Sequence, residues 1–275
     1  MPELPEVEYI ARQLREELVG RRITGVEVSW ARSLGGADPA DIAAEVVGRT
    51  ITGIGRRAKY LLMYLDDGEV LTVHRRMSGN LVLAPPAEPD QWVRVAFDLD
   101  DGRRLLFTDP RKFGRLAVVP RDALDAYFAA VGPEPLEPEF TPEALAKRLA
   151  GTKRPIKAAL LDQSVVAGLG NIYADEALYR AGIHPLRPAA SLTSEESARL
   201  RDAIRAVLEA AIAYGGTTIG RHRDVYDEAG TNVEHLLVYR RTGEPCTQCG
   251  TPIERIVVGQ RGTHFCPTCQ PLRIA

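Results

Sequence analysis

Long apolar runs and an excess of basic residues are both missing from this chain of 275 residues. No stretch approaches the roughly 20 apolar residues that a helix needs to cross a bilayer, which excludes a helical membrane protein. The first eight residues contain three glutamates and no apolar core, which excludes a secretory signal or a transit peptide. We therefore expect a cytoplasmic protein.

The net charge of −2 at pH 7 argues against a protein whose whole surface attracts nucleic acid, because phosphate binding favours a basic footprint. Short basic groups are nevertheless present. Groups of this kind are more often solvated turns than binding sites, so they decide nothing by themselves. They lie at residues 56–59, 75–76, 111–115 and 153–157.

The length favours two domains over one. An amphipathic helix is expected over residues 6–19, because apolar residues recur there at helical spacing. Short β-rich runs follow, some joined by turns such as Asp67-Gly68, and they indicate a sandwich or barrel. The predicted strands cover residues 23–30, 50–54, 60–65, 70–74, 93–99, 104–107 and 116–119.

One stretch of sequence, residues 18–26, is echoed at residues 46–54. Each copy is typical of a helix end, a glycine cap and a strand start. Two copies are too few for a solenoid, so we expect two pseudo-symmetric connections within one sandwich. A β-turn is predicted at Gly53 to Gly55, ahead of Lys59.

Three prolines within residues 131–138 stiffen the chain and predict a linker. The expected fold is therefore α+β and multidomain. Residues 1–131 form an N-terminal β-sandwich domain with flanking helices, 132–138 the linker, 139–240 a helical domain and 241–275 a β-hairpin. Helices of the second domain are expected over residues 141–150, 156–162, 171–181 and 193–214.

All four cysteines fall in two Cys-x-x-Cys pairs separated by 16 residues, a spacing typical of a tetrahedral site for one structural zinc ion. The alternatives are two disulfides, which a cytosolic chain disfavours, and a redox pair, which the lack of an adjoining βαβ pattern disfavours. Strands at 253–258 and 263–265 flank residues 259–262, a hairpin tip that presents Arg261. The predicted ligands are Cys246, Cys249, Cys266 and Cys269.

Seven sequence blocks, in order along nearly the whole chain, make it similar to the superfamily of formamidopyrimidine-DNA glycosylase and endonuclease VIII. No single block is enough to establish the resemblance. It rests on the occurrence of all seven blocks in the same order. It implies a helix-two-turns-helix element at residues 161–176 and an enzyme of base excision repair that acts on double-stranded DNA. The blocks are Pro2 to Glu8, Arg57 to Tyr60, His74 to Gly79, Asp109 to Gly114, Leu161 to Gln163, Gly168 to Glu176 and Gly262 to Cys266.

The resemblance implies that Pro2, exposed by removal of Met1, is the nucleophile. Attack of its secondary amine on C1′ of a damaged nucleoside gives an iminium, which acidifies the C2′ proton and permits strand cleavage by β,δ-elimination. Glu3 is implied as the acid or base that assists opening of the sugar ring. Lys59 is implied as a proton donor and phosphate ligand, and Arg261 as a phosphate ligand with a suitable planar fork. By themselves, Pro2 and its neighbours are also compatible with a stiff leader, and Lys59 with a solvated surface lysine.

Excision of a base from a duplex requires that the nucleotide be extruded and the gap be filled. The resemblance assigns the filling residues as Met77, Arg111 and Phe113. Without it, Met77 and Phe113 would be interpreted as core residues. Contacts to the DNA backbone are implied for Lys112, Lys153 and Asn171.

The chain departs from the family pattern at several positions. Arg75 places a charge on the approach to Met77, where an apolar residue is usual. Trp92 stands where a DNA-contacting histidine is common, and we assign it no role. The base-capping loop begins normally at Gly215 but then diverges, and residues 231–234 replace an aromatic-Gln pair. Because that loop reads oxidised guanine largely through backbone amides, these changes weaken the substrate assignment without reversing it.

The motif that starts at Pro2 is typical of the formamidopyrimidine branch, so we expect excision of 8-oxoguanine and ring-opened purines opposite cytosine. The alternatives are an endonuclease VIII-like enzyme for oxidised pyrimidines, a lesion-binding protein without catalysis and a zinc-ribbon protein with no enzymatic role. The presence of Pro2, Glu3 and Lys59 argues against an inactive protein. The family expectation is a bacterial cytoplasmic monomer, nucleoid-associated when acting, with one structural Zn²⁺ and no membrane partner.

Overall fold

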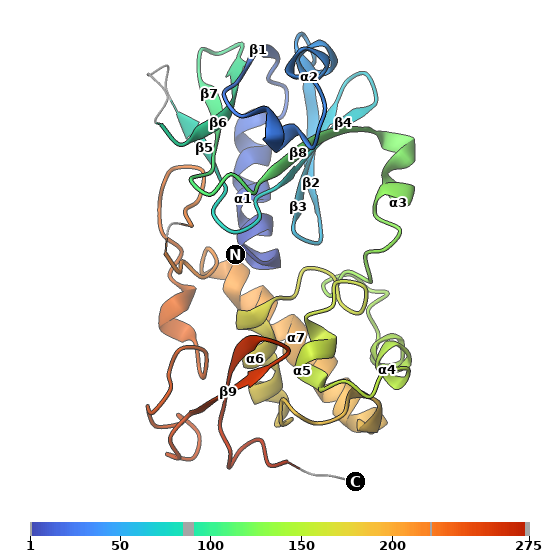
Figure 1. The fold of residues 1–275 in the computed structure, drawn as a ribbon, viewed down its shortest axis with the longest axis vertical. Helices are drawn as coiled ribbons and strands as arrows, with labels where there is room; N and C mark the ends of the chain where they lie inside the picture. The colour runs from blue at the N-terminus through green and yellow to red at the C-terminus, as the bar shows by residue number, and fades with distance from the viewer. Residues whose placement is uncertain (1, 85–90, 221, 273–275) are drawn as a thin grey trace. The chain divides into compact units, whose positions relative to one another are not determined.

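The computed structural model describes residues 2–84, 91–220 and 222–272, and the chain forms two compact units (Figure 1). The first unit comprises Met1–Ala129 and Tyr214–Val233, and the second Ala130–Ala213 and Glu234–Ala275. The segment Tyr214–Val233 thus belongs with the first unit, although it follows a helix of the second. The domain boundaries expected at residues 131, 138 and 240 stay predictions.

The first unit is a β-sandwich of two four-stranded antiparallel sheets, ordered β1-β6-β7-β5 and β2-β3-β4-β8. The sequence predicted every strand except β5, whose apolar run after Asn80 is too short for a period to show. The strands are β1 (Ile23–Val28), β2 (Ile51–Arg57), β3 (Tyr60–Leu65), β4 (Glu69–His74), β5 (Asn80–Ala84), β6 (Val93–Leu99), β7 (Arg104–Thr108) and β8 (Arg115–Pro120).

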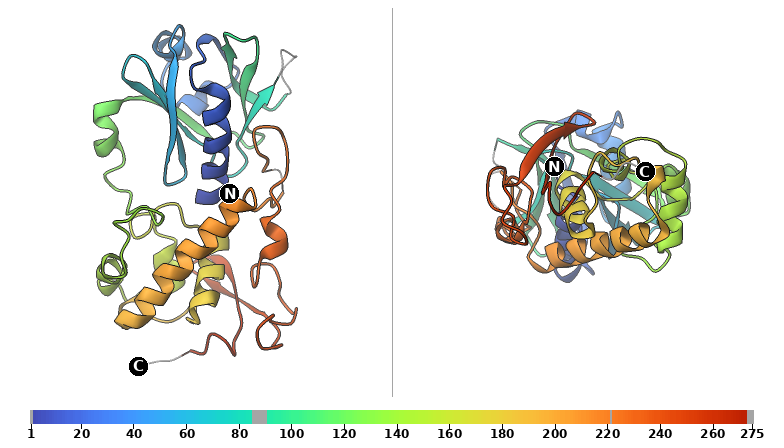
Figure 2. Two further views of the ribbon diagram at one scale, coloured as in Figure 1. Left: turned by 180° about the vertical axis from the view of Figure 1, so that it is seen from behind. Right: turned by 90° about the horizontal axis from the view of Figure 1, so that it is seen from below.

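Helix α1 (Leu4–Leu18) runs alongside both sheets of the first unit (Figure 1 and Figure 2). Its apolar stripe, which includes Val7, Ile10 and Leu14, joins the core that the two sheets share. The stripe fixes the rotation of the helix and with it the position of its first turn. Two short α-helices, α2 (Pro39–Val46) and α3 (Leu124–Tyr127), also belong to this unit; the sequence predicted only the end of α2, and α3 was not predicted.

The two echoed segments form connections that confirm the predicted pseudo-symmetry. Gly20 and Gly48 follow α1 and α2 with positive φ angles of 88° and 82°. The Gly20 amide donates to the Ile51 carbonyl at 2.8 Å, and the Gly48 amide donates to the Ile23 carbonyl at 2.7 Å. This exchange joins the starts of β1 and β2, which belong to different sheets.

The β-turn predicted at Gly53 to Gly55 is wrong, because both glycines lie within strand β2. A Cβ at Gly55 would come within 3.3 Å of the Tyr64 ring on β3, so this glycine makes room for an aromatic side chain. The chain instead reverses at Ala58, whose φ is 51°, directly before Lys59.

Among its described residues, the second unit contains four α-helices and a two-stranded hairpin. Helix α7 packs against α4 and α6, and strand β10 packs against α6. In the described part of the chain, no helix is both long enough and apolar enough to cross a membrane. The elements are α4 (Pro142–Ala150), α5 (Ile156–Leu160), α6 (Asn171–Ala181), α7 (Ser194–Ala213), β9 (Glu254–Val258) and β10 (Arg261–Phe265), all within two residues of the predicted bounds.

Candidate functional site

The start of the chain is held by the carboxylate of Glu6, in the first turn of α1. Its Oε2 accepts the backbone N–H of Glu3 at 2.7 Å, and its Oε1 accepts that of Thr217 at 2.8 Å. Pro2 and Glu3 are both buried. With Met1 removed, the nitrogen of Pro2 becomes a secondary amine in a fixed turn that also carries two carboxylates. Sequence reasoning gave Glu6 no role.

Lys59 lies in the turn between β2 and β3 and is only 6% exposed, so the alternative of a solvated lysine is wrong. Across the sheet, His74 pairs with Tyr60 and meets its ring edge-on at 4.4 Å. Burial lowers the pKa of His74, and together with the charges of Arg76 and Lys59 it brings the pKa to about 3. His74 is therefore neutral near pH 7, and its Nδ1 accepts the backbone N–H of Arg76 at 3.0 Å.

The neutral state of His74 predicts how stability depends on pH. Folding lowers the pKa of His74 from its ordinary value of 6.5, so only the unfolded chain is protonated as the pH falls below that value. The contribution of His74 to the unfolding free energy is complete above pH 6.5 and is lost progressively as the pH falls to about 3. Between pH 7.5 and 5.5 we expect the native protein to lose about 1.4 kcal/mol more unfolding free energy than His74→Gln. Urea unfolding measures the two losses, and equal losses would contradict a neutral His74.

Met77 and Phe113 stand out from the first unit, with 42% and 47% of their surface exposed. The alternative interpretation of both as core residues is therefore wrong. The Arg111 guanidinium lies 4.9 Å from the ring centre of Phe113, and the Lys112 ammonium lies 3.9 Å from that of Trp30. An exposed thioether and an exposed ring beside cations suit stacking on bases and contact with phosphates.

The turn that carries Phe113 is organised by Asp109, a residue to which the sequence analysis gave no role. Its carboxylate is fully buried and accepts the backbone N–H groups of Phe113 and Gly114, both at 2.7 Å. It also accepts the hydroxyl of Ser78, in the Met77 turn (residues 75–80). One carboxylate thus fixes the Met77 turn and the Phe113 turn relative to each other.

Asp109→Asn tests this organising role with almost no change in shape. The amide keeps one acceptor oxygen and no charge, so we expect the unfolding free energy to fall by about 2 to 4 kcal/mol. The exposed Asp122 provides the matched control, and Asp122→Asn should change stability by less than about 0.5 kcal/mol. Urea titration compares the variants, and a similarly small loss in both would contradict the role of Asp109.

Arg75, which we expected to place a charge on the approach to Met77, is only 2% exposed. The turn folds back over the side chain, whose guanidinium donates to the Gly79 carbonyl at 2.8 Å and to Asn80 Oδ1 at 2.6 Å. Trp92 is partly buried at the wall of a cavity of about 380 Å³ in the first unit. The other lining residues are Ser78, Asn80, Val82, Val93, Leu106, Thr108, Pro110, Arg223 and Asp227.

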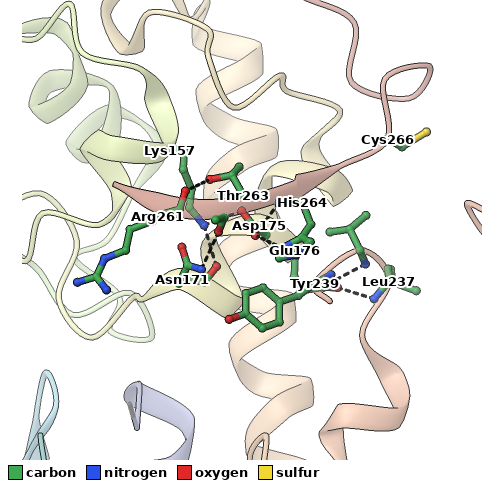
Figure 3. Close-up of polar contacts among 12 residues, drawn as sticks. Lys157, Asn171, Asp175, Glu176, Leu237, Tyr239, Arg261, Thr263, His264 and Cys266 are labelled. Atoms are coloured by element: carbon green, nitrogen blue, oxygen red, sulfur yellow. Dashed lines mark hydrogen bonds and ion pairs between the residues drawn. The ribbon is translucent and has the colours of Figure 1, made fainter. Parts of the chain in front are cut away.

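In the second unit, a buried ion pair joins α5 to α6, and its carboxylate also contacts the hairpin (Figure 3). Asp175 accepts the Lys157 ammonium at 2.6 Å and the backbone N–H of His264 at 3.0 Å. Lys157 also donates to the Asn171 carbonyl at 2.7 Å, and the Asn171 side chain donates to the Gly262 carbonyl at 2.9 Å. The first turn of α6 and strand β10 are therefore locked together.

Glu176, the next residue along α6, anchors the chain that leads to the hairpin (Figure 3). Its carboxylate accepts the backbone N–H groups of Leu237, Val238 and Tyr239 at 2.8 to 2.9 Å. Burial raises the pKa of Glu176, although these three hydrogen bonds favour its charged form. Sequence reasoning missed Glu176, Asp175 and Lys157. The signal that could have identified them was the presence of charged residues among apolar helix positions.

Three predicted DNA-contacting residues lie in the second unit. Lys153 is exposed in the loop before α5, and Oδ1 of Asn171 is buried without a hydrogen-bond partner among the described residues. The side chain of Arg261 extends away from the hairpin (Figure 3). The predicted tip needs a correction: the turn is Gly259–Gln260, both with positive φ, and Arg261 is the first residue of β10.

The four cysteine sulfurs form one cluster, in which every pair lies within 4.8 Å. Sγ of Cys246 is 3.8 Å from that of Cys269, and Sγ of Cys249 is 3.5 Å from that of Cys266. Zn–S bonds of about 2.3 Å in a tetrahedron place sulfurs about 3.8 Å apart, whereas a disulfide requires about 2.05 Å. All four are free thiols, so the disulfide alternative is wrong and the set fits one structural zinc ion.

Hydrogen-bond donors around the sulfurs agree with a thiolate cluster. The backbone N–H of Gln248 donates to Cys246 Sγ, and that of Cys269 donates to Cys266 Sγ, both at 3.4 Å. The hydroxyl of Tyr179, on α6, lies 3.1 Å from Cys246 Sγ. Donors of this kind orient metal-binding thiolates, and Tyr179 also links the cluster to the helical part of the unit.

Three family models match consecutive parts of the chain. Residues 1–116 match the formamidopyrimidine-DNA glycosylase N-terminal domain, and residues 131–223 match the H2TH domain of the same glycosylase. Residues 243–272 match the zinc finger found in FPG and IleRS. The matches follow one another in the order expected from the sequence blocks.

Curated relatives and solved structures are similar over nearly the full length. The formamidopyrimidine-DNA glycosylases of Chloroflexus aurantiacus and Chloroflexus aggregans are both 53% identical, with 98% and 99% of each chain covered. A complex of Lactococcus lactis Fpg with abasic-site DNA has a TM-score of 0.92 at 37% identity, covering 98% of this chain and 100% of that chain. Another Lactococcus lactis Fpg complex, with DNA containing an oxidised pyrimidine, has a TM-score of 0.92 at 36% identity and the same coverage.

Proposed function

Because the chain belongs to the formamidopyrimidine-DNA glycosylase family, we propose that it is a bifunctional DNA glycosylase and AP lyase of base excision repair. Its substrates are 8-oxoguanine and formamidopyrimidines in double-stranded DNA. The observation that carries the proposal is the 53% identity over 272 residues to a glycosylase of that name. The buried N-terminal turn with Pro2 and Glu3 supports it chemically.

The reaction uses the nitrogen of Pro2 as nucleophile. Its lone pair forms a bond to C1′ while the bond from C1′ to the base breaks, and the base leaves with a proton. Ring opening then breaks the C1′–O4′ bond and leaves an iminium between Pro2 and C1′. Loss of the C2′ proton expels the 3′ phosphate, and a second elimination expels the 5′ phosphate. The iminium acts as the electron sink for the eliminations.

Glu3 and Lys59 supply the proton transfers of this scheme. Glu3 precedes the first turn of α1 and gives a proton to O4′ as the sugar opens. Lys59 is buried within its tight turn, which limits the freedom of its ammonium and suits it to donate a proton or hold one phosphate. Neither residue is an ordinary solvated surface charge, and this supports their catalytic roles.

Contacts to DNA are assigned to exposed side chains of both units. Met77 and Phe113 fill the space left by the extruded nucleotide, and Arg111 contacts the base left without a partner. Their exposure and the fixed turns that carry them support these roles. Backbone phosphates are bound by Lys112, Lys153, Asn171 and Arg261.

Cys246, Cys249, Cys266 and Cys269 hold one zinc ion, which supplies a structural crosslink and no reactive group. This crosslink stabilises the hairpin that carries Arg261. We also propose that the protein acts as a cytoplasmic monomer that associates with the nucleoid, and that its domains end near residues 131 and 240.

An enzyme for oxidised pyrimidines is the second candidate. A relative solved with DNA containing an oxidised pyrimidine favours it, as does the divergent segment after Gly215. A lesion-binding protein without catalysis is disfavoured because Pro2, Glu3 and Lys59 are all retained and buried.

Borohydride trapping on a set of duplexes tests the proposal. The duplexes carry 8-oxoguanine, a ring-opened guanine, thymine glycol, an abasic site or no damage. We expect covalent adducts with both purine lesions opposite cytosine and with the abasic site. Adducts with thymine glycol but not the purines would favour the second candidate. Absence of an adduct with every duplex would overturn the enzymatic function.

A further inference from the structure

Three separate segments of the first unit meet at the guanidinium of Arg75. Its Nε donates to the Gly79 carbonyl at 2.8 Å, within the Met77 turn. One Nη donates to the carbonyl of Glu6, in the first turn of α1, at 3.4 Å. The other Nη donates to Asn80 Oδ1 at 2.6 Å and to the Arg223 carbonyl, in the segment 214–233, at 3.2 Å.

The side chain of Arg75 is held in one position, because the surrounding chain leaves it little conformational freedom. Arg75 is 2% exposed, and its own carbonyl accepts the Gly79 amide at 2.9 Å. A Cβ at Gly79 would lie 2.5 Å from that carbonyl oxygen, so the turn requires glycine there. Burial lowers the pKa of Arg75 to about 10, while the charges of Glu6 and Asp224 raise it, so the side chain stays protonated near pH 7.

The same three segments surround the N-terminal turn. Glu6 accepts the backbone N–H groups of both Glu3 and Thr217, so the segment 214–233 lies directly against the turn that carries Pro2. On the other side, Arg75 connects that segment to the Met77 turn. The Met77 turn and the segment 214–233 also line the 380 Å³ cavity. The turn contributes Ser78 and Asn80, and the segment contributes Arg223 and Asp227.

We propose that Arg75 is a positioning residue that sets the segment 214–233 and the Met77 turn around Pro2 and thereby controls the acceptance of a damaged base. The inference rests on the proposed function. A nucleotide that still carries its base reaches the Pro2 nitrogen in one orientation only, and small displacements of the surrounding walls slow attack strongly. An abasic sugar has no base to accommodate, so its reaction with Pro2 depends much less on Arg75.

Two substitutions at Arg75 and one control test the proposal. Arg75→Leu removes all four donated hydrogen bonds, and Arg75→Lys keeps the charge without the planar fork. Val70→Ala is the control, because it opens a space at a fully buried position of β4, the strand that leads to Arg75, without touching the three segments. Single-turnover excision of 8-oxoguanine and borohydride trapping on abasic DNA are measured for each, with amide hydrogen exchange of residues 222–230 in the free protein.

We expect Arg75→Leu to slow excision about 10-fold or more while abasic trapping stays within about 2-fold, because only excision needs the base to be oriented. Arg75→Lys should fall between this variant and the native protein, and exchange at residues 222–230 should accelerate in the same order. Val70→Ala should lower the melting temperature and leave the ratio of the two activities unchanged. If Arg75→Leu does not fold, Arg75→Lys decides the outcome.

An unchanged ratio of excision to abasic trapping in a folded Arg75 variant would overturn the proposal. So would unchanged hydrogen exchange at residues 222–230. If the native protein forms no adduct with any duplex, the proposed function fails instead, and the exchange measurement still reports whether Arg75 holds the segment.

Discussion

Protein that retains Met1 is expected to form no borohydride-reducible adduct with 8-oxoguanine or abasic DNA, whereas protein that begins at Pro2 forms both. In the first form the nitrogen of Pro2 is part of a peptide bond and has no free lone pair to attack C1′. The two forms share every residue from Pro2 onward. We expect the excision rates to differ by on the order of 10³ or more, as is usual when a covalent nucleophile is lost.

Both forms are obtained from one expression system, with and without inhibition of methionine aminopeptidase, and mass spectrometry assigns them. Equal binding to undamaged DNA would show that the extra residue leaves the rest of the protein intact. Glu3→Gln serves as a further comparison, because it keeps the amine and removes only the proton donor. Adduct formation by the Met1-containing form at the native rate would rule out Pro2 as the nucleophile.

Loss of the zinc site is expected to have the second large effect. Cys266 is fully buried in the cluster, and Cys266→Ser removes one thiolate without adding bulk. Structural zinc sites contribute about 10 to 16 kcal/mol of binding free energy in small zinc-finger peptides, so the hairpin has little stability without the ion. We expect zinc content to fall from one ion per chain to nearly none and DNA affinity to fall about 100-fold or more.

Gln248→Ala is the matched control for this substitution. Gln248 is exposed between two predicted ligands, and its contribution to the cluster is a backbone N–H that alanine retains. Zinc content from elemental analysis and DNA binding should both match the native protein. A Cys266→Ser variant that kept its zinc and its DNA affinity would contradict a structural four-cysteine site.

Much of this protein could be predicted from local sequence. The spacing of the four cysteines predicted a cluster whose geometry fits zinc, because a ligand set of one residue type leaves few alternatives. The echo of residues 18–26 at 46–54 predicted two related connections, because glycine caps and strand starts depend on neighbouring residues. Strand β5 was missed, since its short run gave no periodic signal.

Features set by distant neighbours could not be predicted in this way. Sequence reasoning predicted a charge at Arg75 on the approach to Met77 and a turn at two glycines, yet the Arg75 side chain is buried and the glycines lie in β2. It also overlooked Glu6, Asp109 and Asp175, whose partners are largely backbone amides or side chains brought near by folding.

The sequence by itself determined most of the elements, the predicted metal ligands and the chemically distinctive N-terminus, because each depends on residue types at short spacing. Only the tertiary structure decided that the segment 214–233 folds onto the first unit and that buried charges hold its turns. The physical reason is that a charged group can be buried only where partners surround it. These partners come from parts of the chain that no local pattern connects.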